Sequence, residues 1–457
     1  MSDAAPPATT RVAPARSAGR SWAIALLLAS ASFLVLFDSL AVATALPAIG
    51  DEFALRPGVL QWVVSLYSLT IGAFLVLGGR VCDVWGRRRV MLAGLAVCTG
   101  AGLLAGLAPN LPLLLAGRAL QGIAAAFALP AALSTAAGEF DTEPWRSRVF
   151  SVIAFAAWSA GLAGAMLGGV LTTQFGWRWV FLVTVPVGAI ALAGASMLLP
   201  ADRPGTVSGQ RLNVTSAVLV SAGLIVLLLG LQEIGQDGGG VRASILGLAG
   251  LALLALLVVV ERRSAYPMVK PSLLASRRRA GSYLAFGTYC AGYTALIVIG
   301  SQALQEKYGL SADAAGLALS PVLVGGAISS TLGPLLMRRF SSRTIVVTAM
   351  TVCALSLSLI ATTDSVPRLM PWLLLWGLCS GPIFVGLTRE CISDAPEDDR
   401  GTASALFESM SHVGGALAVA AFMTMLGAGI TFRSVELTGA LVVAAGALLT
   451  LLVIPRR

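Results

Sequence analysis

Fourteen apolar segments of about 20 residues each run through the chain, separated by short connections that hold most of its Pro and charged residues. A helix of about 20 residues crosses the hydrocarbon core of a bilayer, because it rises 1.5 Å per residue across about 30 Å. Charged residues make up 12% of the chain, about half their share in soluble domains. The sequence therefore predicts an all-α polytopic membrane protein with spans at residues 22–47, 59–79, 89–108, 111–137, 149–171, 178–199, 212–231, 242–260, 281–304, 315–337, 344–362, 369–391, 402–426 and 436–454.

The distribution of basic residues predicts the orientation of these spans, because Lys and Arg accumulate on the cytoplasmic side of membrane proteins. If the N-terminus lies inside, the cytoplasmic segments hold 24 of the 31 Lys and Arg residues, the outer segments hold six, and Arg118 lies within a span. We therefore expect both termini to be cytoplasmic. The net charge of +9 then belongs to one membrane face, so nucleic-acid binding is not expected.

A short charged segment at residues 79–89 connects the second and third spans. Its glycines allow a tight reversal, and its aspartate can cap or salt-bridge a neighbouring helix end. Alternatively, it is a basic cytoplasmic loop with no mechanical role. The residues expected to form a cytoplasmic gate are Gly79, Asp83, Gly86, Arg87 and Arg88.

A weak repeat divides the chain into two halves. Residues 333–343 follow the tenth span as residues 79–89 follow the second, with the basic residues kept and the aspartate lost. Paired halves around a central cavity are common in transporters. The predicted parts are a disordered cytoplasmic tail (1–20), a six-helix half (21–200), two additional helices (201–261), a basic cytoplasmic linker (262–280) and a second six-helix half (281–457).

Several ordered motifs resemble those of the fourteen-span drug:proton antiporters of the major facilitator superfamily. Residues 79–89 resemble its loop signature G-x-L-x-D-x-x-G-R-R/K-x, and residues 36–47 resemble L-D-x-T-V-V-N-x-A-L-P with Ser and Ala for the Thr and Asn. Residues 118–122 match R-x-x-Q-G, and residues 177–186 resemble W-R-W-x-F-x-x-N-x-P. The resemblance implies the major facilitator fold, two six-helix halves plus two central spans, and transport by alternating access.

Asp38 and Arg118 are the first candidates for proton coupling. Ionisable groups inside spans are costly, so their default interpretation is functional. By helical rise, Asp38 lies about 15 Å and Arg118 about 10 Å below the outer surface, which permits direct or water-mediated pairing. We expect Asp38 to bind a proton as substrate leaves. The alternative is a static ion pair that joins the first and fourth spans.

Glu408 and His412 are a second candidate pair, because residues four apart lie on one helix face. His412 is the single histidine of the chain, and histidine is a common proton relay. The alternative is a solvated glutamate with a hydrogen-bonded packing histidine. Neighbouring Arg389 and Glu390 are expected to neutralise each other at the membrane interface.

The fifth span carries small residues that resemble the family's antiporter pattern G-P-x-x-G-G, with Ala165 in place of the proline. Gly161, Ala165 and Gly169 recur every four residues, which predicts a smooth helix face for close approach between the moving halves. Ordinary small-residue packing is the alternative. The full set of residues in this predicted seam is Gly161, Gly164, Ala165, Gly168 and Gly169.

Together these features favour a proton-coupled secondary transporter that exports lipophilic drugs or natural products, cationic ones among them. Neither a Walker motif nor a catalytic constellation is found, so an enzyme or ATP-driven pump is not expected. We expect no cofactor or metal, a monomer, a lipophilic substrate and protons as the bound species, and multidrug efflux with antibiotic resistance in a bacterial cytoplasmic membrane. The alternatives are a proton-coupled importer of a small metabolite and a non-transporting membrane receptor or assembly protein.

Overall fold

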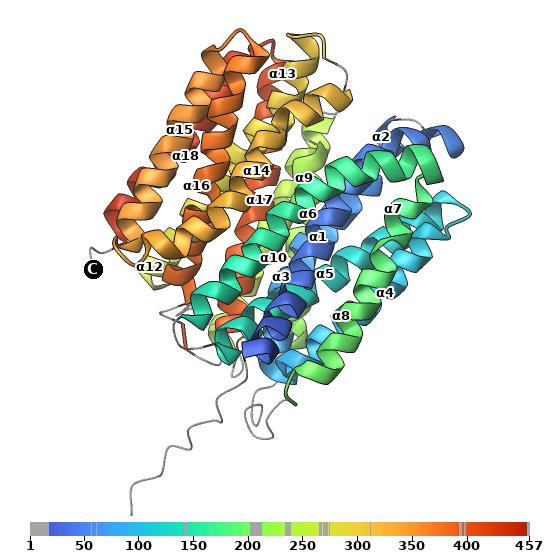
Figure 1. Ribbon diagram of the computed structural model, residues 1–457, viewed down its shortest axis with the longest axis vertical. Coiled ribbons are helices and arrows are strands. Elements are labelled where there is room, and N and C mark those ends of the chain that lie inside the picture. The colour runs from blue at the N-terminus through green and yellow to red at the C-terminus, as the bar shows by residue number, and fades with distance from the viewer. Residues whose placement is uncertain are drawn as a thin grey trace, which may run out of the picture.

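Long, tilted helices build almost the entire computed structural model (Figure 1). It describes residues 18–454 except 56, 61, 141–143, 202–212, 234–238, 265–266, 268–272, 274, 311, 393–394 and 397–398. Within these residues, thirteen helices are long and apolar enough to cross a membrane, and residues 214–230 form a shorter apolar helix. The chain is thus a multi-pass membrane protein, as its composition predicted.

Eight helices form the N-terminal half. Its six long helices run alternately up and down, and two short ones, α2 and α7, lie at one end (Figure 1). The helices are α1 (Ala18–Glu52), α2 (Pro57–Leu60), α3 (Trp62–Trp85), α4 (Arg87–Gly106), α5 (Leu111–Glu139), α6 (Trp145–Phe175), α7 (Arg178–Leu182) and α8 (Thr184–Leu198). We call the end where α3 finishes the Asp83 end, and the end where α1 finishes the Glu52 end.

The C-terminal half has the same kind of construction, and a π-helical turn interrupts its first span. Its elements are α12 (Arg277–Thr294), the π-helix η1 (Ala295–Ile299), α13 (Gly300–Glu306), α14 (Ala312–Leu336), α15 (Ser342–Thr362), α16 (Val366–Ile392), α17 (Arg400–Gly427) and α18 (Phe432–Val453). Each half packs its own apolar core, around Trp376 and Phe407 in this half and around Met91 and Phe181 in the other.

Small residues set the closest helix approaches, as expected where lipid supplies no hydrophobic drive between helices. A Cβ on Gly78 of α3 would collide with the backbone of Ala126 in α5. In the same way, a Cβ on Gly377 of α16 would collide with the backbone of Val322 in α14. These contacts hold α3 against α5 and α14 against α16, and thereby fix where the polar residues of each helix lie.

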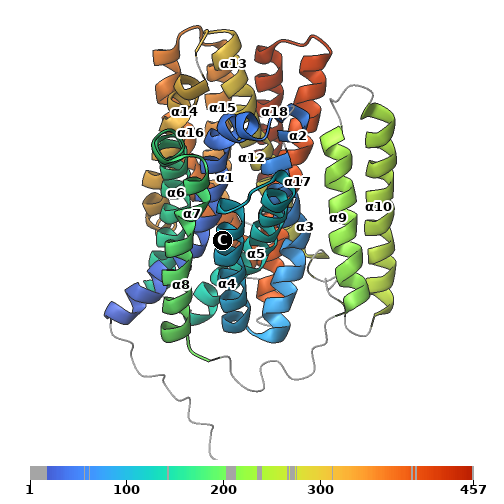
Figure 2. The ribbon, with the colours of Figure 1, turned by 90° about the vertical axis from the view of Figure 1, so that its right-hand side faces the viewer.

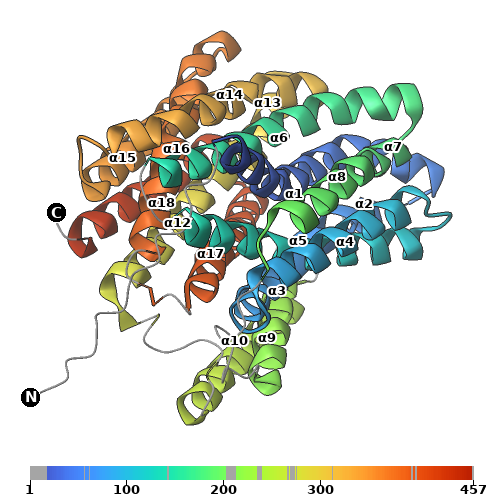
Figure 3. The same cartoon turned by 60° about the horizontal axis from the view of Figure 1, so that its bottom comes forward.

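Between the halves in sequence, α9 (Val214–Glu233) and α10 (Gly239–Arg263) form a separate pair. They stand beside the bundle in Figures 2 and 3. Val220 and Leu224 of α9 pack into a cluster with Val76 of α3 and Val413 of α17. The pair therefore covers the side of the bundle where α3 of the N-terminal half meets α17 of the C-terminal half.

Two predicted boundaries need correction. Residues 18–20, placed in the disordered tail, form the first turn of α1, where Trp22 packs edge-on against Trp145 with ring centroids 5.6 Å apart. The helix α12 begins at Arg277, inside the predicted basic linker, because the Ser276 side chain caps it by accepting from the Arg279 amide. The rest of the predicted tail (1–17) and residues 265–266, 268–272 and 274 of the linker lie outside the described residues.

Candidate functional site

A buried polar cluster lies inside the N-terminal half, where α1, α3 and α5 meet. Arg118 of α5 is fully buried, and Asp38 of α1 is 4% exposed. An Arg118 Nη1 proton is donated to Asp38 Oδ2, and the same nitrogen lies 2.9 Å from Gln121 Oε1. Gln121 in turn donates to Asp38 Oδ1 at 3.1 Å. The first candidate pair for proton coupling, Asp38 and Arg118, is thus in direct contact.

Backbone and aromatic contacts hold the guanidinium in place. Arg118 Nε donates to the carbonyl oxygen of Val63 on α3 at 2.7 Å. The guanidinium carbon lies 4.5 Å from the ring centroid of Tyr67, whose hydroxyl donates to the Val35 carbonyl at 3.0 Å. A cation over an aromatic face is stabilised most where water is excluded. Arg118 is therefore fixed from three helices.

The close approach of α5 to α3 depends on Gly122, the glycine of the R-x-x-Q-G motif. A Cβ at this position would lie 2.5 Å from the Tyr67 carbonyl oxygen and would collide with the Thr70 hydroxyl. A larger residue would thus push α5 away from the carbonyl and ring that hold Arg118. The motif supplies both the charged group and the space for it.

The charge of Arg118 is balanced by Asp38 in this cluster. Among the described residues, the Nη2 of Arg118 has no hydrogen-bond partner although it is buried. Protonating Asp38 would remove the only carboxylate that contacts this guanidinium within the part of the chain described. An uncompensated buried charge is strongly unfavourable, so the burial of Arg118 depends on this ion pair.

Gln121 and Tyr67 were not among the predicted site residues. The motif containing Gln121 was recognised, but helical spacing alone does not show that its amide bridges Asp38 and Arg118. Tyr67 gave no signal in the sequence, because an aromatic residue in an apolar span usually packs against its neighbours.

The second site lies at the Asp83 end, where α3 meets the first turn of α17. The Asp83 carboxylate accepts from the Gly401 amide at 3.2 Å, the Thr402 amide at 3.0 Å and the Thr402 hydroxyl at 2.9 Å. It therefore caps a helix of the other half, whose own N-cap residue Asp399 makes no side-chain capping bond. An anion at a helix N-terminus is stabilised by the free amides and the helix dipole.

Both glycines of the 79–89 motif have identifiable structural roles. A Cβ on Gly79 would lie 2.6 Å from the Gly401 carbonyl oxygen, so only glycine lets α3 approach α17 this closely. Gly86 has φ of 98°, a conformation that favours glycine, at the reversal between α3 and α4. The predicted reversal and the predicted capping of a neighbouring helix end by Asp83 are both present.

The arginines of the motif separate into different contacts. Arg80 forms an ion pair with Asp399 at 3.7 Å, with both side chains buried, which adds a second link between the halves. Arg88 donates to the Ser196 carbonyl of α8 at 2.7 Å, and Arg87 lies against Gly138 of α5. Of these, Arg80 was not predicted as a gate residue, whereas Arg87 and Arg88 stay within the N-terminal half.

Glu408 and His412 lie half-buried on α17. His412 packs against α3 at Gly72 and near Leu228 of α9. Among the described residues, neither side chain forms a hydrogen bond or ion pair with the other or with Asp38. The structure thus does not join this pair to the Asp38 cluster.

The glycines of α6 differ in what they contact. A Cβ on Gly164 would lie 2.7 Å from the Phe37 carbonyl oxygen, and a Cβ on Gly168 would lie 2.7 Å from Ala41 Cα of α1. Gly169 has no atom within 4 Å of a Cβ position. Gly164 and Gly168, spaced four apart, therefore turn toward α1 in the same half. A Cβ on Gly161, the first residue of the predicted face, would lie 3.4 Å from Leu323 of α14 in the other half.

The expected pairing of Arg389 with Glu390 is wrong. Neighbouring helical residues point about 100° apart, and Glu390 instead accepts from Arg278 Nε of α12. Arg389 lies against the Met337 sulfur at 3.9 Å.

At the Glu52 end, the W-R-W motif also has a structural partner that sequence did not reveal. Arg178 forms two hydrogen bonds to the Glu52 carboxylate, at 2.7 and 2.8 Å, and Trp177 Nε1 donates to it at 2.7 Å. Arg178 also donates to the Ala108 carbonyl. These contacts fasten the end of α1 to α7.

The family description Major Facilitator Superfamily matches residues 28–275 and 282–457. The cephamycin export protein of Amycolatopsis lactamdurans is 34% identical over 90% of this chain and 87% of that protein. The puromycin resistance protein of Streptomyces alboniger is 32% identical over 89% of this chain and 82% of that protein.

The fold is similar to that of the human organic anion transporter MFSD10, with a TM-score of 0.69, 16% sequence identity, and coverage of 94% of this chain and 99% of that one. At this identity the likeness concerns the fold alone. The Major Facilitator Superfamily description matches nearly the whole chain. An antibiotic export protein and an antibiotic resistance protein are each more than 30% identical to it. The chain belongs to the major facilitator superfamily and is a transporter, not an enzyme.

Proposed function

We propose that this protein exports lipophilic antibiotics or related natural products in exchange for protons. The observation that carries the proposal is the Asp38–Arg118–Gln121 cluster, a fully buried arginine whose single carboxylate partner in the described part of the chain can be neutralised by one proton. Exporter and resistance proteins for two different antibiotics are among its relatives, which supports efflux of this substrate class.

Coupling would work through two mutually exclusive states of Asp38. When ionised, it holds α1 against α5 through Arg118. When protonated, it no longer compensates the guanidinium, so a conformation that gives Arg118 another partner or water is favoured. A proton and a substrate can each shift such an equilibrium only by their different affinities for the two states.

The Asp83 contact would be the gate for this cycle. We place the Asp83 end and both termini in the cytoplasm of a bacterium, on the basis of the Lys and Arg distribution. The hydrogen bonds from Gly401 and Thr402 to Asp83 then hold the cytoplasmic side closed. Substrate would enter when these bonds break, and Asp38 would exchange its proton with the outside when they form.

The test is transport by purified protein in proteoliposomes, with puromycin as the probe and wild type compared with Asp38→Asn. For a neutral substrate exchanged with one proton, a gradient of one pH unit supports at most about a tenfold concentration ratio. We expect wild type to build a ratio that rises with the gradient, and Asp38→Asn to exchange puromycin without responding to it.

Two controls separate coupling from binding. Asp51→Asn removes an exposed carboxylate of the same helix and should behave as wild type. Arg118→Lys keeps the charge but loses the geometry that reaches Val63, Asp38 and Gln121 together, so it should lower transport. If Asp38→Asn remains fully coupled, proton binding at Asp38 is refuted.

A further inference from the structure

A groove lies at the Asp83 end of the molecule, between the start of α6 and the end of α14. It has a volume of about 340 Å³, and its lining residues come from both halves. Figure 2 shows α6 and α14 on the side of the bundle opposite to α9 and α10. Trp22 of α1, Phe155 of α6 and Leu335 of α14 line the groove with exposed side chains. Because the chain spans a membrane, we expect these apolar side chains to face lipid.

The groove ends where α6 and α14 pack closely farther along their lengths (Figure 1). A Cβ on Gly326 of α14 would lie 2.3 Å from the ring of Trp158 of α6. That ring also packs edge-on against Tyr293 of α12, with ring centroids 6.1 Å apart. One helical turn further, a Cβ on Gly161 would lie 3.4 Å from Leu323. Side chains thus fill the seam beyond the groove, which separates it from the space between the two halves.

Two arginines, one from each half, supply the charge of this groove. Arg148 lies near the start of α6, and Arg338 follows the end of α14. The guanidinium carbon of Arg148 lies 5.4 Å from the ring centroid of Trp145. Within the part of the chain that the structure describes, neither arginine forms a side-chain hydrogen bond or an ion pair, and no carboxylate lines the groove. The groove therefore attracts an anion, and the planar fork of a guanidinium group matches the geometry of a phosphate.

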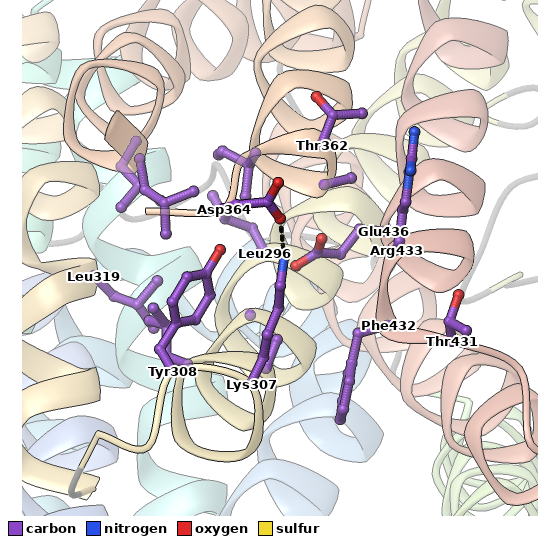
Figure 4. Close-up of a pocket in the computed structure, with 17 residues that line it drawn as sticks. Leu296, Lys307, Tyr308, Leu319, Thr362, Asp364, Thr431, Phe432, Arg433 and Glu436 are labelled. Carbon is purple, nitrogen blue, oxygen red and sulfur yellow. Dashed lines mark hydrogen bonds and ion pairs between the residues drawn. The ribbon is translucent and has the colours of Figure 1, made fainter. Parts of the chain in front are cut away.

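The cavity shown in Figure 4, at the Glu52 end of the C-terminal half, has a different charge balance. Two cations, Lys307 and Arg433, and two carboxylates, Asp364 and Glu436, line it. Lys307 Nζ donates to Asp364 Oδ1 at 2.8 Å. Because its charges balance, that cavity does not select a charged ligand. The groove at the Asp83 end has two positive charges and, among the described residues, no lining counter-ion.

Hydroxyl groups from both halves also line the groove. Ser151 of α6 donates to the Ser147 carbonyl at 2.8 Å, and Thr331 of α14 donates to the Ile328 carbonyl at 2.8 Å. Each hydroxyl oxygen can still accept a hydrogen bond, because a hydroxyl has two lone pairs in addition to its proton. The groove thus matches a headgroup that carries both a phosphate and hydroxyl groups, joined to an apolar body that lies in the membrane.

We propose that this groove binds the headgroup of an anionic phospholipid of the phosphatidylglycerol type. The phosphate lies between Arg148 and Arg338, and the headgroup hydroxyls donate to the groove oxygens. The acyl chains run along Phe155 and Leu335. Because the two arginines belong to different halves, the bound lipid favours the arrangement in which α6 and α14 lie together at this end. The site does not involve Asp38, so it is independent of the proposed export mechanism.

Lipid binding to the purified, delipidated full-length protein tests the proposal, with native mass spectrometry to count the lipids retained at each concentration. Dioleoylphosphatidylglycerol is the probe. Dioleoylphosphatidylcholine has the same chains without the net charge, and glycerol 1-phosphate has the charge without the chains. We expect phosphatidylglycerol to bind at least about tenfold more tightly than either of the other two, because only it satisfies both the arginines and the apolar wall.

A pair of charge variants tests the role of the arginines. Replacing both Arg148 and Arg338 by glutamine should weaken phosphatidylglycerol binding by about 25-fold, the product of about fivefold for each basic residue near an anionic lipid. The matched control replaces both Arg262 and Arg263 by glutamine. It removes the same number of charges from the exposed last turn of α10 and should leave the affinity of the groove unchanged.

A groove-filling variant tests the location without changing any charge. Thr331 lines the groove and is exposed, so Thr331→Trp should fold and should block phosphatidylglycerol binding. This variant keeps the test valid even if the double arginine variant does not fold. Asp38→Asn should bind the lipid as wild type does.

Three results would overturn the proposal. The first is equal binding of phosphatidylglycerol and phosphatidylcholine, which would show that charge does not select the ligand. The second is binding of glycerol 1-phosphate as tight as that of phosphatidylglycerol, which would identify a site for a free phosphate. The third is an equal loss of affinity in the two double variants, or full binding in Thr331→Trp, either of which would place the lipid elsewhere on the surface.

Discussion

Replacing Asp83 by asparagine should open the contact between α3 and α17. The substitution keeps one acceptor oxygen but removes the charge and turns an NH₂ group toward the amides of Gly401 and Thr402. A hydrogen bond to a charged group contributes about 1.5 to 3 kcal/mol, and the charge at a helix N-terminus about 0.3 to 1 kcal/mol. With part of the bonding retained, we expect a net loss of about 2 to 3 kcal/mol from the closed state.

This loss corresponds to a shift of about 30- to 150-fold in the ratio of closed to open protein. Thr402→Val is a graded comparison, because it removes only the hydroxyl bond at 2.9 Å. Loss of one such bond, at about 1 kcal/mol, predicts a shift of about fivefold.

Double electron–electron resonance can measure the populations directly. One spin label replaces Trp85 at the end of α3, and the other replaces Phe340, which follows α14. The two labels report on opposite halves at the same end. Both side chains are exposed, at 58% and 54%. The six native cysteines are replaced first. Asp83→Asn should populate a longer distance, and Thr402→Val should do so to a smaller degree. If both variants keep the wild-type distance distribution, the Asp83 contact does not hold the two halves together.

Two further predictions concern packing and pH. Gly122→Ala should destabilise the protein by about 1 to 3 kcal/mol, because the added Cβ has no room against α3. The control is Gly100→Ala, whose Cβ would meet no atom within 4 Å. Thermal unfolding in detergent should show a lower midpoint for Gly122→Ala than for this control. The hydrogen bond from Lys307 holds the pKa of Asp364 below its usual 3.8, so the ion pair stabilises the folded state above that value and is lost as pH falls through the lowered pKa. The difference in melting midpoint between wild type and Asp364→Asn should therefore be constant near neutral pH and vanish in strong acid, and a difference that grows with acid would contradict this.

Sequence alone was sufficient for the elements that depend on local composition. Apolar runs of membrane length predicted the helices, because a backbone in lipid must satisfy its hydrogen bonds internally. Gly86 and Asp83 were recognised as turn and capping residues, since both roles follow from the chemistry of one residue. The pairing of Asp38 with Arg118 was within reach because charges inside spans are scarce and need partners.

The tertiary structure decided everything that depends on which helix faces point at each other. The sequence spacing of Gly161, Ala165 and Gly169 suggested a seam between the halves, yet the rotation of α6 turns Gly164 and Gly168 toward α1. Glu390 pairs with Arg278 on another helix and not with its chain neighbour Arg389. Gln121 gained its significance only from surroundings built by distant segments, because burial and partner geometry are properties of packed helices and not of a single span.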